Sequence, residues 1–255
     1  MKYAKLFIIF VYHQAMSCIF PVSIFLTLAI SKLVQISYLP RYDFILISCL
    51  VIQWLMLKSG LESRDELKVI AVFHLIGLAL ELYKVNIGSW SYPEEAHTKI
   101  FGVPLYSGFM YASVASYMCQ SWRRLNLRLI YWPNRMLVWS LGGLIYLNFY
   151  TNFILPDIRW FLIIFMFILF YRTRVLYTLM NKVFYMPIVL SFLFIGFFIW
   201  IAENISTFLG AWQYPNQSNY WQLVHFSKIT SWFLLVVISF LIVSELKYVK
   251  RQLKS

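Results

Sequence analysis

Charged residues are scarce in this sequence, and their scarcity excludes a water-soluble domain. Only 13% of the 255 residues are charged, whereas 61% are hydrophobic and 20% are aromatic. A soluble domain of this length needs more charge than that on its surface. Since the mean hydropathy is also high, +0.70, we expect the chain to lie in a membrane.

Cysteine and histidine are also rare, which limits disulfide and metal chemistry. The three cysteines, an odd number, all fall inside apolar stretches, so we expect small buried side chains instead of a disulfide framework. Four histidines are too few for the histidine-rich boxes of membrane di-iron oxygenases. Because no nucleotide-binding, P-loop or haem motif is visible either, we predict neither a metal site nor a bound cofactor.

Long apolar runs, by contrast, are abundant. Runs of about 18 or more apolar residues indicate transmembrane helices. The first run could begin earlier than its core, because residues 5–12 are apolar too, and Pro21 would then kink the helix. We predict an all-α protein with about eight transmembrane helices, over residues 17–35, 42–58, 68–85, 103–121, 134–152, 157–177, 185–205 and 226–246.

The formal net charge of +12 would suggest nucleic acid as the partner of a soluble protein, but here the charge follows the topology. Sixteen of the 22 Lys and Arg residues, and four of the ten acids, fall on the side that carries both termini. The other side carries six basic and six acidic residues. This positive-inside asymmetry predicts that both termini are cytoplasmic, that the lipid bilayer is the main partner, and that nucleic acid is not one.

One motif occurs twice in the chain. Residues 81–93 and 203–215 both read Glu-x6-Gly-x-Trp-x-Tyr-Pro, and they stand 122 residues apart. The same offset carries three predicted helices of the first half close to three of the second half. We therefore predict a four-helix unit written twice, over 1–128 and 129–255. An even number of helices in each unit makes the two repeats parallel.

Glu81 and Glu203, the first residues of the motif, lie near the outer ends of two predicted helices. An ionised carboxylate at the centre of a bilayer costs about 2.5–3.5 kcal/mol, and intramembrane acids are functional by default. In one interpretation each glutamate is hydrated or is paired with Lys84 or Lys228. In the other, a pseudo-two-fold axis brings both to one cavity, where they divide the roles of acid and base.

Other polar residues in the predicted spans also have two interpretations. His74, seven residues before the first glutamate on the same helix face, is either a proton relay or a histidine satisfied by a neighbouring helix. Asn86 and Asn204 lie close to the glutamates in sequence and could hold the carboxylates. Asn148 and Asn152, four residues apart on one helix, are either substrate contacts or amides that join two helices.

The aromatic residues of the motif, Trp90, Tyr92, Trp212 and Tyr214, are typical of a membrane interface. Residues two apart point to the same side of an extended segment. The four side chains could therefore line one wall of a substrate site, and aromatic faces suit a polyene, a sugar or a developing cation.

Separately, "PRYDF" and "PDIRW", at residues 40–44 and 156–160, each predict an Asp–Arg clamp at the outer surface.

Several stretches make the sequence resemble a known bacterial membrane family. They include "RYDF", "FHLIGLALELYK", "IGSWSYPE", "YLNFYTNF", "PDIRW" and "WIAENISTFLGAWQYPNQ". Nearly the whole chain is similar to the family catalogued as domain of unknown function 817 (YoaT-like). The resemblance implies a multi-pass protein of the bacterial cell membrane, and it implies no particular activity.

The chain is also similar, more distantly, to the carotenoid-type lycopene cyclase domains. Those domains place an acid seven residues before Gly-x-Trp-x-Tyr, as Glu81 stands before Gly88, Trp90 and Tyr92 here. The resemblance implies small helical repeats used in pairs and a cavity for a hydrophobic substrate. The catalytic glutamate pair of those domains is not carried over, because residues 104–107 read Pro-Leu-Tyr-Ser at that place.

Three functions are compatible with these features. The first is an acid–base enzyme, or a degenerate enzyme, that acts on an isoprenoid or lipid-like substrate between the repeats, with Glu81, Glu203 and His74 as catalytic residues. The second is a proton- or cation-coupled transporter that uses the same glutamates. The third is a non-catalytic membrane partner protein. Few interior prolines interrupt the predicted helices, which favours the enzyme over the transporter.

Overall fold

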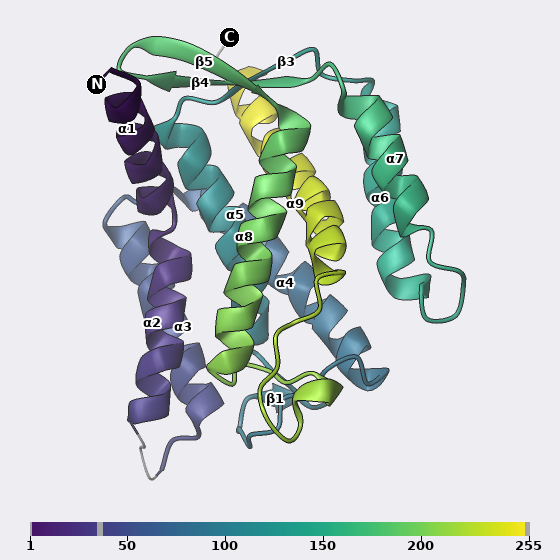
Figure 1. The fold of residues 1–255 in the computed structure, drawn as a ribbon. Helices are drawn as coiled ribbons and strands as arrows, with labels where there is room; N and C mark the ends of the chain where they lie inside the picture. The colour runs from purple at the N-terminus through teal and green to yellow at the C-terminus, as the bar shows by residue number, and fades with distance from the viewer. Residues whose placement is uncertain (1, 35–37, 253–255) are drawn as a thin grey trace. The chain divides into compact units, whose positions relative to one another are not determined.

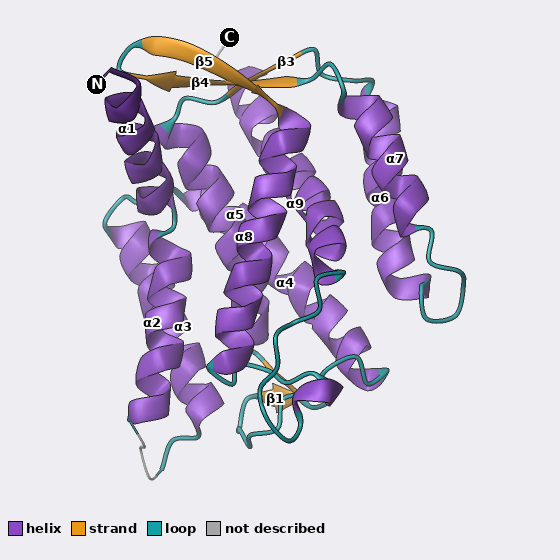
Figure 2. Ribbon diagram, viewed as in Figure 1, coloured by secondary structure: helices purple, strands orange, loops and turns teal. Residues whose placement is uncertain are grey.

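The computed structural model describes residues 2–34 and 38–252, with side chains described over residues 4–34 and 38–247. This part of the chain is mostly helical (Figures 1 and 2). The α-helices are α1 (Lys2–Ser17), α2 (Ile19–Leu33), α3 (Arg41–Lys58), α4 (Arg64–Asn86), α5 (Ser107–Arg124), α6 (Arg135–Thr151), α7 (Arg159–Phe170), α8 (Ile188–Phe208) and α9 (Lys228–Gln252). The strands are β1 (Lys99–Ile100), β2 (Val103–Pro104), β3 (Arg128–Ile130), β4 (Arg174–Leu179) and β5 (Lys182–Pro187).

The chain divides into two compact units. Unit 1 contains Met1–Ser17, Met118–Trp200 and His225–Ser255, and unit 2 contains Cys18–Tyr117 and Ile201–Val224. Helices α5 and α8 each contribute residues to both units. Each unit draws on both predicted repeats, so the compact units and the repeats are different divisions of the chain. The repeat boundary after residue 128 stays a prediction.

Within the described part of the chain, three helical segments are long and apolar enough to cross a membrane, namely α4, α8 and Lys228–Lys247 of α9. Helices α1 and α2 add a fourth candidate if they form one broken span. Helix α7 is apolar but has 12 residues, a length of about 18 Å against a hydrocarbon core of about 30 Å. The fold is consistent with a membrane protein, and the figure of eight transmembrane helices stays a prediction.

Pro21 accounts for the interruption between α1 and α2. Proline lacks an N–H, and its ring clashes with the carbonyl four residues earlier, here that of Ser17, where α1 ends. Pro21 is the third residue of α2, where a backbone N–H has no partner within the helix in any case. The helix begins at Lys2, so the early start considered from the sequence is confirmed.

The predicted helix over residues 157–177 is wrong after Phe170, where α7 ends. Strands β4 and β5 form an antiparallel hairpin, and β3 pairs with β4 (orange in Figure 2). The turn residues Met180 and Asn181 have φ of 47° and 61°, as a two-residue turn of type I′ requires. Hydropathy did not reveal the hairpin because its apolar and aromatic residues continue the run that α7 begins.

Apolar side chains remain exposed along several helices. On α2 these side chains recur every three or four residues, which places them in one stripe. A contiguous apolar stripe is unfavourable in water and suits contact with lipid. The stripe on α2 consists of Val22, Leu26, Ile30 and Leu33.

Candidate functional site

The two copies of the repeated motif make the same turn at the ends of α4 and α8. In both, the glycine seven residues after the glutamate has a positive φ, 74° at Gly88 and 71° at Gly210. The glycine N–H donates to the carbonyl three residues earlier at 3.0 Å, and the next N–H donates to the carbonyl five residues earlier at 2.9 Å. This is a Schellman turn, and its left-handed position explains why glycine stands there.

The turn brings the tyrosine of each motif back onto its own glutamate. The Tyr92 hydroxyl donates to Glu81 Oε2 at 2.7 Å, and the Tyr214 hydroxyl donates to Glu203 Oε1 at 2.5 Å. The two glutamates are only 5% and 3% exposed. A buried carboxylate needs such charge-assisted hydrogen bonds, so the spacing from Glu to Tyr has a physical reason.

Glu81 has two further donors. Trp90 Nε1 donates to Oε2 at 2.7 Å, and the Tyr111 hydroxyl donates to Oε1 at 2.8 Å. Burial, followed by the charge of Glu81, raises the pKa of Tyr92 well above its ordinary value, so this phenol keeps the proton that it donates. Three donors suit a carboxylate, which only accepts hydrogen bonds when it is ionised.

Two glycines allow α4 and α5 to approach each other at this site. A Cβ added to Gly77 would lie 2.5 Å from the Tyr111 ring, and one added to Gly108 would lie 2.8 Å from the His74 ring. Sequence reasoning missed Tyr111 as a site residue. The small residues around it on α5 were a usable signal, because they indicate a helix that packs closely against a neighbour.

The two motif loops are bonded to each other within unit 2. Ser91 and Gln213, which occupy equivalent motif positions, exchange both backbone hydrogen bonds at 2.9 Å in an antiparallel bridge. The Trp90 and Tyr214 rings meet nearly edge to face, with centroids 6.0 Å apart. One aromatic partner of Glu81 therefore contacts the phenol that binds Glu203. Reciprocal bonds between equivalent residues are what a local two-fold relation produces.

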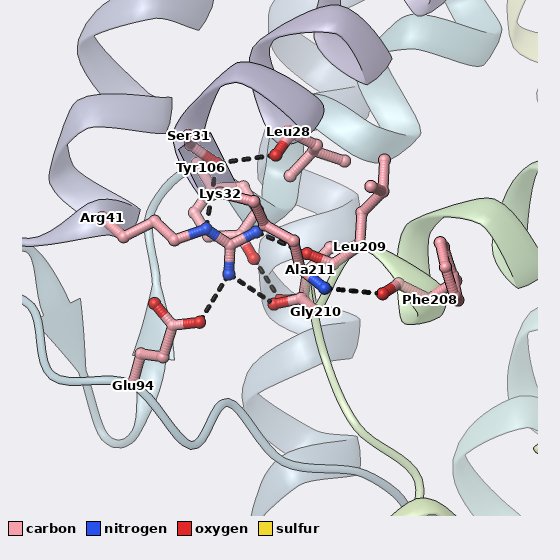
Figure 3. Close-up of polar contacts among 10 residues, drawn as sticks. All are labelled: Leu28, Ser31, Lys32, Arg41, Glu94, Tyr106, Phe208, Leu209, Gly210 and Ala211. Atoms are coloured by element: carbon pink, nitrogen blue, oxygen red, sulfur yellow. Dashed lines mark hydrogen bonds and ion pairs between the residues drawn. The ribbon is translucent and has the colours of Figure 1, made fainter. Parts of the chain in front are cut away.

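Side chains from three segments of unit 2 bind the C-terminal end of α8 and the loop after it (Figure 3). Lys32 Nζ donates to the carbonyl of Phe208 at 2.8 Å. The Arg41 guanidinium donates to the next two carbonyls at 2.5 and 3.1 Å, and the Tyr106 hydroxyl donates to the carbonyl of Ala211. Cations at this position satisfy open carbonyls and complement the helix dipole.

The first of the two predicted Asp–Arg clamps is wrong. Arg41 pairs with Glu94 at 2.5 Å, while Asp43 accepts hydrogen bonds from the backbone N–H groups of His97 and Thr98. The two residues stand two apart on α3, so they face different directions. The second clamp is present, because its Arg and Asp, residues 159 and 157, lie 2.9 Å apart.

Comparison with known sequences places this chain in a family. The sequence model described as "Protein of unknown function (DUF817)" matches residues 6–240. The chain belongs to this family, as its sequence motifs predicted. It is 58% identical over 252 residues to "Uncharacterized protein YoaT" of Bacillus subtilis (strain 168), a match that covers 99% of this chain and 96% of the relative. No solved structure matches the DUF817 chain.

Three other predicted site residues lie in unit 2 of the DUF817 chain. His74 Nδ1 is buried without a hydrogen-bond partner among the described residues. Asn86 is exposed, and no hydrogen bond joins it to the carboxylate of Glu81 in the described structure. Asn204 is buried, and its Oδ1 accepts a hydrogen bond from the Val224 N–H at 2.8 Å. It thus holds the loop after the second motif.

Asn148 and Asn152 lie in unit 1 of the DUF817 chain, whereas the glutamates lie in unit 2. Asn148 is buried, donates to Asp157 at 3.0 Å and accepts from the Ile158 N–H at 3.1 Å. These bonds connect α6 to the start of α7, as expected of an amide that joins two helices. Asn152 is the residue directly after the last turn of α6.

Proposed function

We propose that this DUF817 protein is a multi-pass protein of the bacterial cell membrane in which Glu81 and Glu203 form an acid–base site for a hydrophobic, isoprenoid- or lipid-like substrate. One observation carries the proposal. Two helices that are long and apolar enough to span a membrane bury a carboxylate at the same motif position, and both carboxylates lie in unit 2. Intramembrane acids are costly, and those that persist are usually functional.

The proposed architecture is eight transmembrane helices in two parallel four-helix repeats, with both termini cytoplasmic. Its support is local. The two motif copies share the same Schellman turn and the same Tyr-to-Glu bond, and they meet at the Ser91–Gln213 bridge. A pseudo-two-fold axis along the membrane normal would pass close to that bridge and would place both glutamates on the outer side.

In this proposal the two acids have different roles. Glu81 acts as the base, and the incoming proton goes to Oε1, which has one described donor, whereas Oε2 has two. Glu203, which is also buried, acts as the acid. His74 lies about 10 Å from Glu81 along α4 and has an open Nδ1, so it is the candidate to relay a proton toward the site.

The test is mass spectrometry of small molecules that copurify with the protein, with wild type beside Glu81→Gln and Glu203→Gln. Glutamine keeps the shape of the side chain but loses the titrating group. Glu95→Gln is the matched control, because Glu95 is exposed in a loop of the same unit. A lipid or isoprenoid that is enriched on wild type and the control, but altered on both site variants, supports the proposal. Bulk membrane lipid alone on all four proteins contradicts it and favours a non-catalytic partner protein.

One observation favours a second candidate, proton- or cation-coupled transport through the same glutamates. The apolar helices α1 and α2 meet at a bend of 60° at Cys18, and transporters build substrate sites from discontinuous helices. Uptake into proteoliposomes under an imposed pH gradient tests this candidate. A solute whose uptake needs the gradient and is lost in Glu81→Gln supports transport, and gradient-independent uptake of every solute argues against it.

A further inference from the structure

A pocket of about 220 Å³ opens in unit 2 at the C-terminal end of α8. Neither Glu81 nor Glu203 lines it, so it is separate from the proposed acid–base site. Its wall contains three aromatic and five polar side chains. The aromatic ones are Phe208, Trp212 and Trp221, and the polar ones are Lys32, Glu94, Thr207, Gln213 and Gln217.

Each of the two charged side chains of the pocket has a bonding partner within the protein. Lys32 donates to the Phe208 carbonyl at 2.8 Å, and Glu94 Oε1 is paired with Arg41 at 2.5 Å. The pocket therefore contains one positive and one negative group, each with a protein partner. The carboxylate of Glu94 would repel a phosphate, and Lys32 would repel an ammonium ion. A neutral ligand avoids both repulsions.

The polar groups of the pocket retain hydrogen-bonding capacity of both kinds. Gln213 Nε2 donates to the carbonyl of Gln217 at 2.7 Å, which leaves its Oε1 as an acceptor. Glu94 Oε2 is a second acceptor, because Arg41 takes Oε1. Lys32 uses one of its three N–H groups on Phe208 and keeps two as donors. Hydroxyl groups, which donate and accept together, match this set.

The aromatic side chains present their apolar ring faces to the pocket and not their polar N–H groups. Trp221 Nε1 donates to Thr207 Oγ1 at 3.1 Å, which fixes the indole and engages its only donor. The Phe208 ring meets Trp221 edge to face, with centroids 5.5 Å apart. Both side chains are exposed, Trp221 by 41% and Phe208 by 59%. A fixed and exposed indole face is suited to stacking against a flat apolar surface of a ligand.

We infer that this pocket binds a neutral polyhydroxylated group, namely a sugar ring. Its hydroxyls pair with Gln213, Glu94 and Lys32, and its C–H face stacks on the indoles. The volume of about 220 Å³ lies below the range of about 300–1,000 Å³ for drug-sized ligands, so one ring fits and an oligosaccharide does not. The sugar is either free in solution or the headgroup of a glycolipid.

The test uses the full chain in phosphatidylglycerol nanodiscs, purified without glycosidic detergents because their sugar heads would occupy the pocket. In one arm, saturation-transfer NMR measures binding of methyl β-D-glucopyranoside. In the other, native mass spectrometry measures retention of glucosyl-diacylglycerol added to the disc. We expect binding in at least one arm, and the arm that responds identifies the source of the sugar. No binding in either arm overturns the inference, as does competition by glycerol phosphate at equal concentration.

Variants separate this pocket from the acid–base site. Gln213→Leu and Trp221→Leu are expected to weaken sugar binding at least tenfold. Tyr220→Leu is the matched control, since Tyr220 is 68% exposed beside Trp221 but does not line the pocket. Glu81→Gln should bind sugar like wild type, so failure of the proposed function leaves this inference standing. Unchanged affinity in the folded Gln213→Leu protein would refute it.

Discussion

Replacement of Gly77 by alanine should destabilise the protein by moving Tyr111 away from Glu81. The new Cβ would lie 2.5 Å from the Tyr111 ring, where ordinary contacts begin at 3.4 Å. The ring must therefore withdraw by almost 1 Å, or the two helices must separate. Either movement stretches the 2.8 Å bond from the Tyr111 hydroxyl to Glu81 Oε1. The change tests whether the close approach of α4 and α5 positions this donor.

Three terms set the size of the effect. Overpacking a close contact costs about 1–3 kcal/mol. Loss of a hydrogen bond to a charged group costs about 1.5–3 kcal/mol when it is complete. Alanine in place of glycine stabilises a helix interior by about 1 kcal/mol. With the bond weakened but not lost, we expect a net destabilisation of about 2–3 kcal/mol.

The assay is unfolding by SDS in mixed micelles, followed by tryptophan fluorescence. Gly143→Ala is the matched control, because a Cβ there meets nothing within 4 Å and should stabilise α6 by up to about 1 kcal/mol. In a double-mutant cycle, Tyr111→Ala removes the ring, so Gly77→Ala should then cost little. If Gly77→Ala is as stable as Gly143→Ala, or if its cost persists without the Tyr111 ring, the reasoning is refuted.

Three further predictions concern other parts of the chain. Arg41→Lys should lower the free energy of unfolding in SDS by about 1–3 kcal/mol, because one ammonium cannot reach all the acceptors of a guanidinium; an unchanged midpoint contradicts this. Met180→Asn should raise the free energy of unfolding by about 1 kcal/mol, since asparagine tolerates positive φ. A lower free energy of unfolding would show that the turn is not of type I′. Ser91→Cys with Gln213→Cys should form a disulfide on oxidation, because the Cα atoms of a hydrogen-bonded antiparallel pair lie about 5.5 Å apart. A maleimide gel shift detects the disulfide, and Ser91→Cys with Asn216→Cys is the control that should stay reduced.

The sequence allowed the repeated motif to be found, but not the inward direction of its aromatic residues. The spacing of two residues correctly indicated that Trp90 and Tyr92 point to the same side of the segment, since both donate to Glu81 Oε2. It could not show that both side chains bind the carboxylate of Glu81. The Schellman turn reverses the chain, and reversal is a three-dimensional property that hydropathy and spacing do not carry.

The errors of the sequence predictions have two physical causes. Hydropathy reports whether a segment is apolar but not whether its period is that of a helix or of a strand, so the β4–β5 hairpin was absorbed into a predicted helix. Pairing of nearby opposite charges is equally unreliable, because Arg41 found Glu94, 53 residues away, instead of Asp43. Which distant residue pairs with a side chain depends on which loop the fold brings next to it. Tyr111 was missed for the same reason, since it lies 30 residues from Glu81.

Glu81 and Glu203 each precede the same kind of turn, but their chemical surroundings differ. Several neighbours of Glu81 have no counterpart beside Glu203, because the residues 122 positions after His74, Lys84 and Tyr111 are glycine, serine and phenylalanine. Tyr111 donates to Glu81, and a phenylalanine at the twin position has no hydroxyl to donate. Two carboxylates in different environments hold their protons with different strength, which is the condition for one to serve as acid and the other as base. A purely structural pair would have no need for that difference. Glu81→Gln and Glu203→Gln should therefore change the copurifying lipid in different ways, and profiles identical to wild type in both variants would indicate that the motif serves only to fasten its two loops.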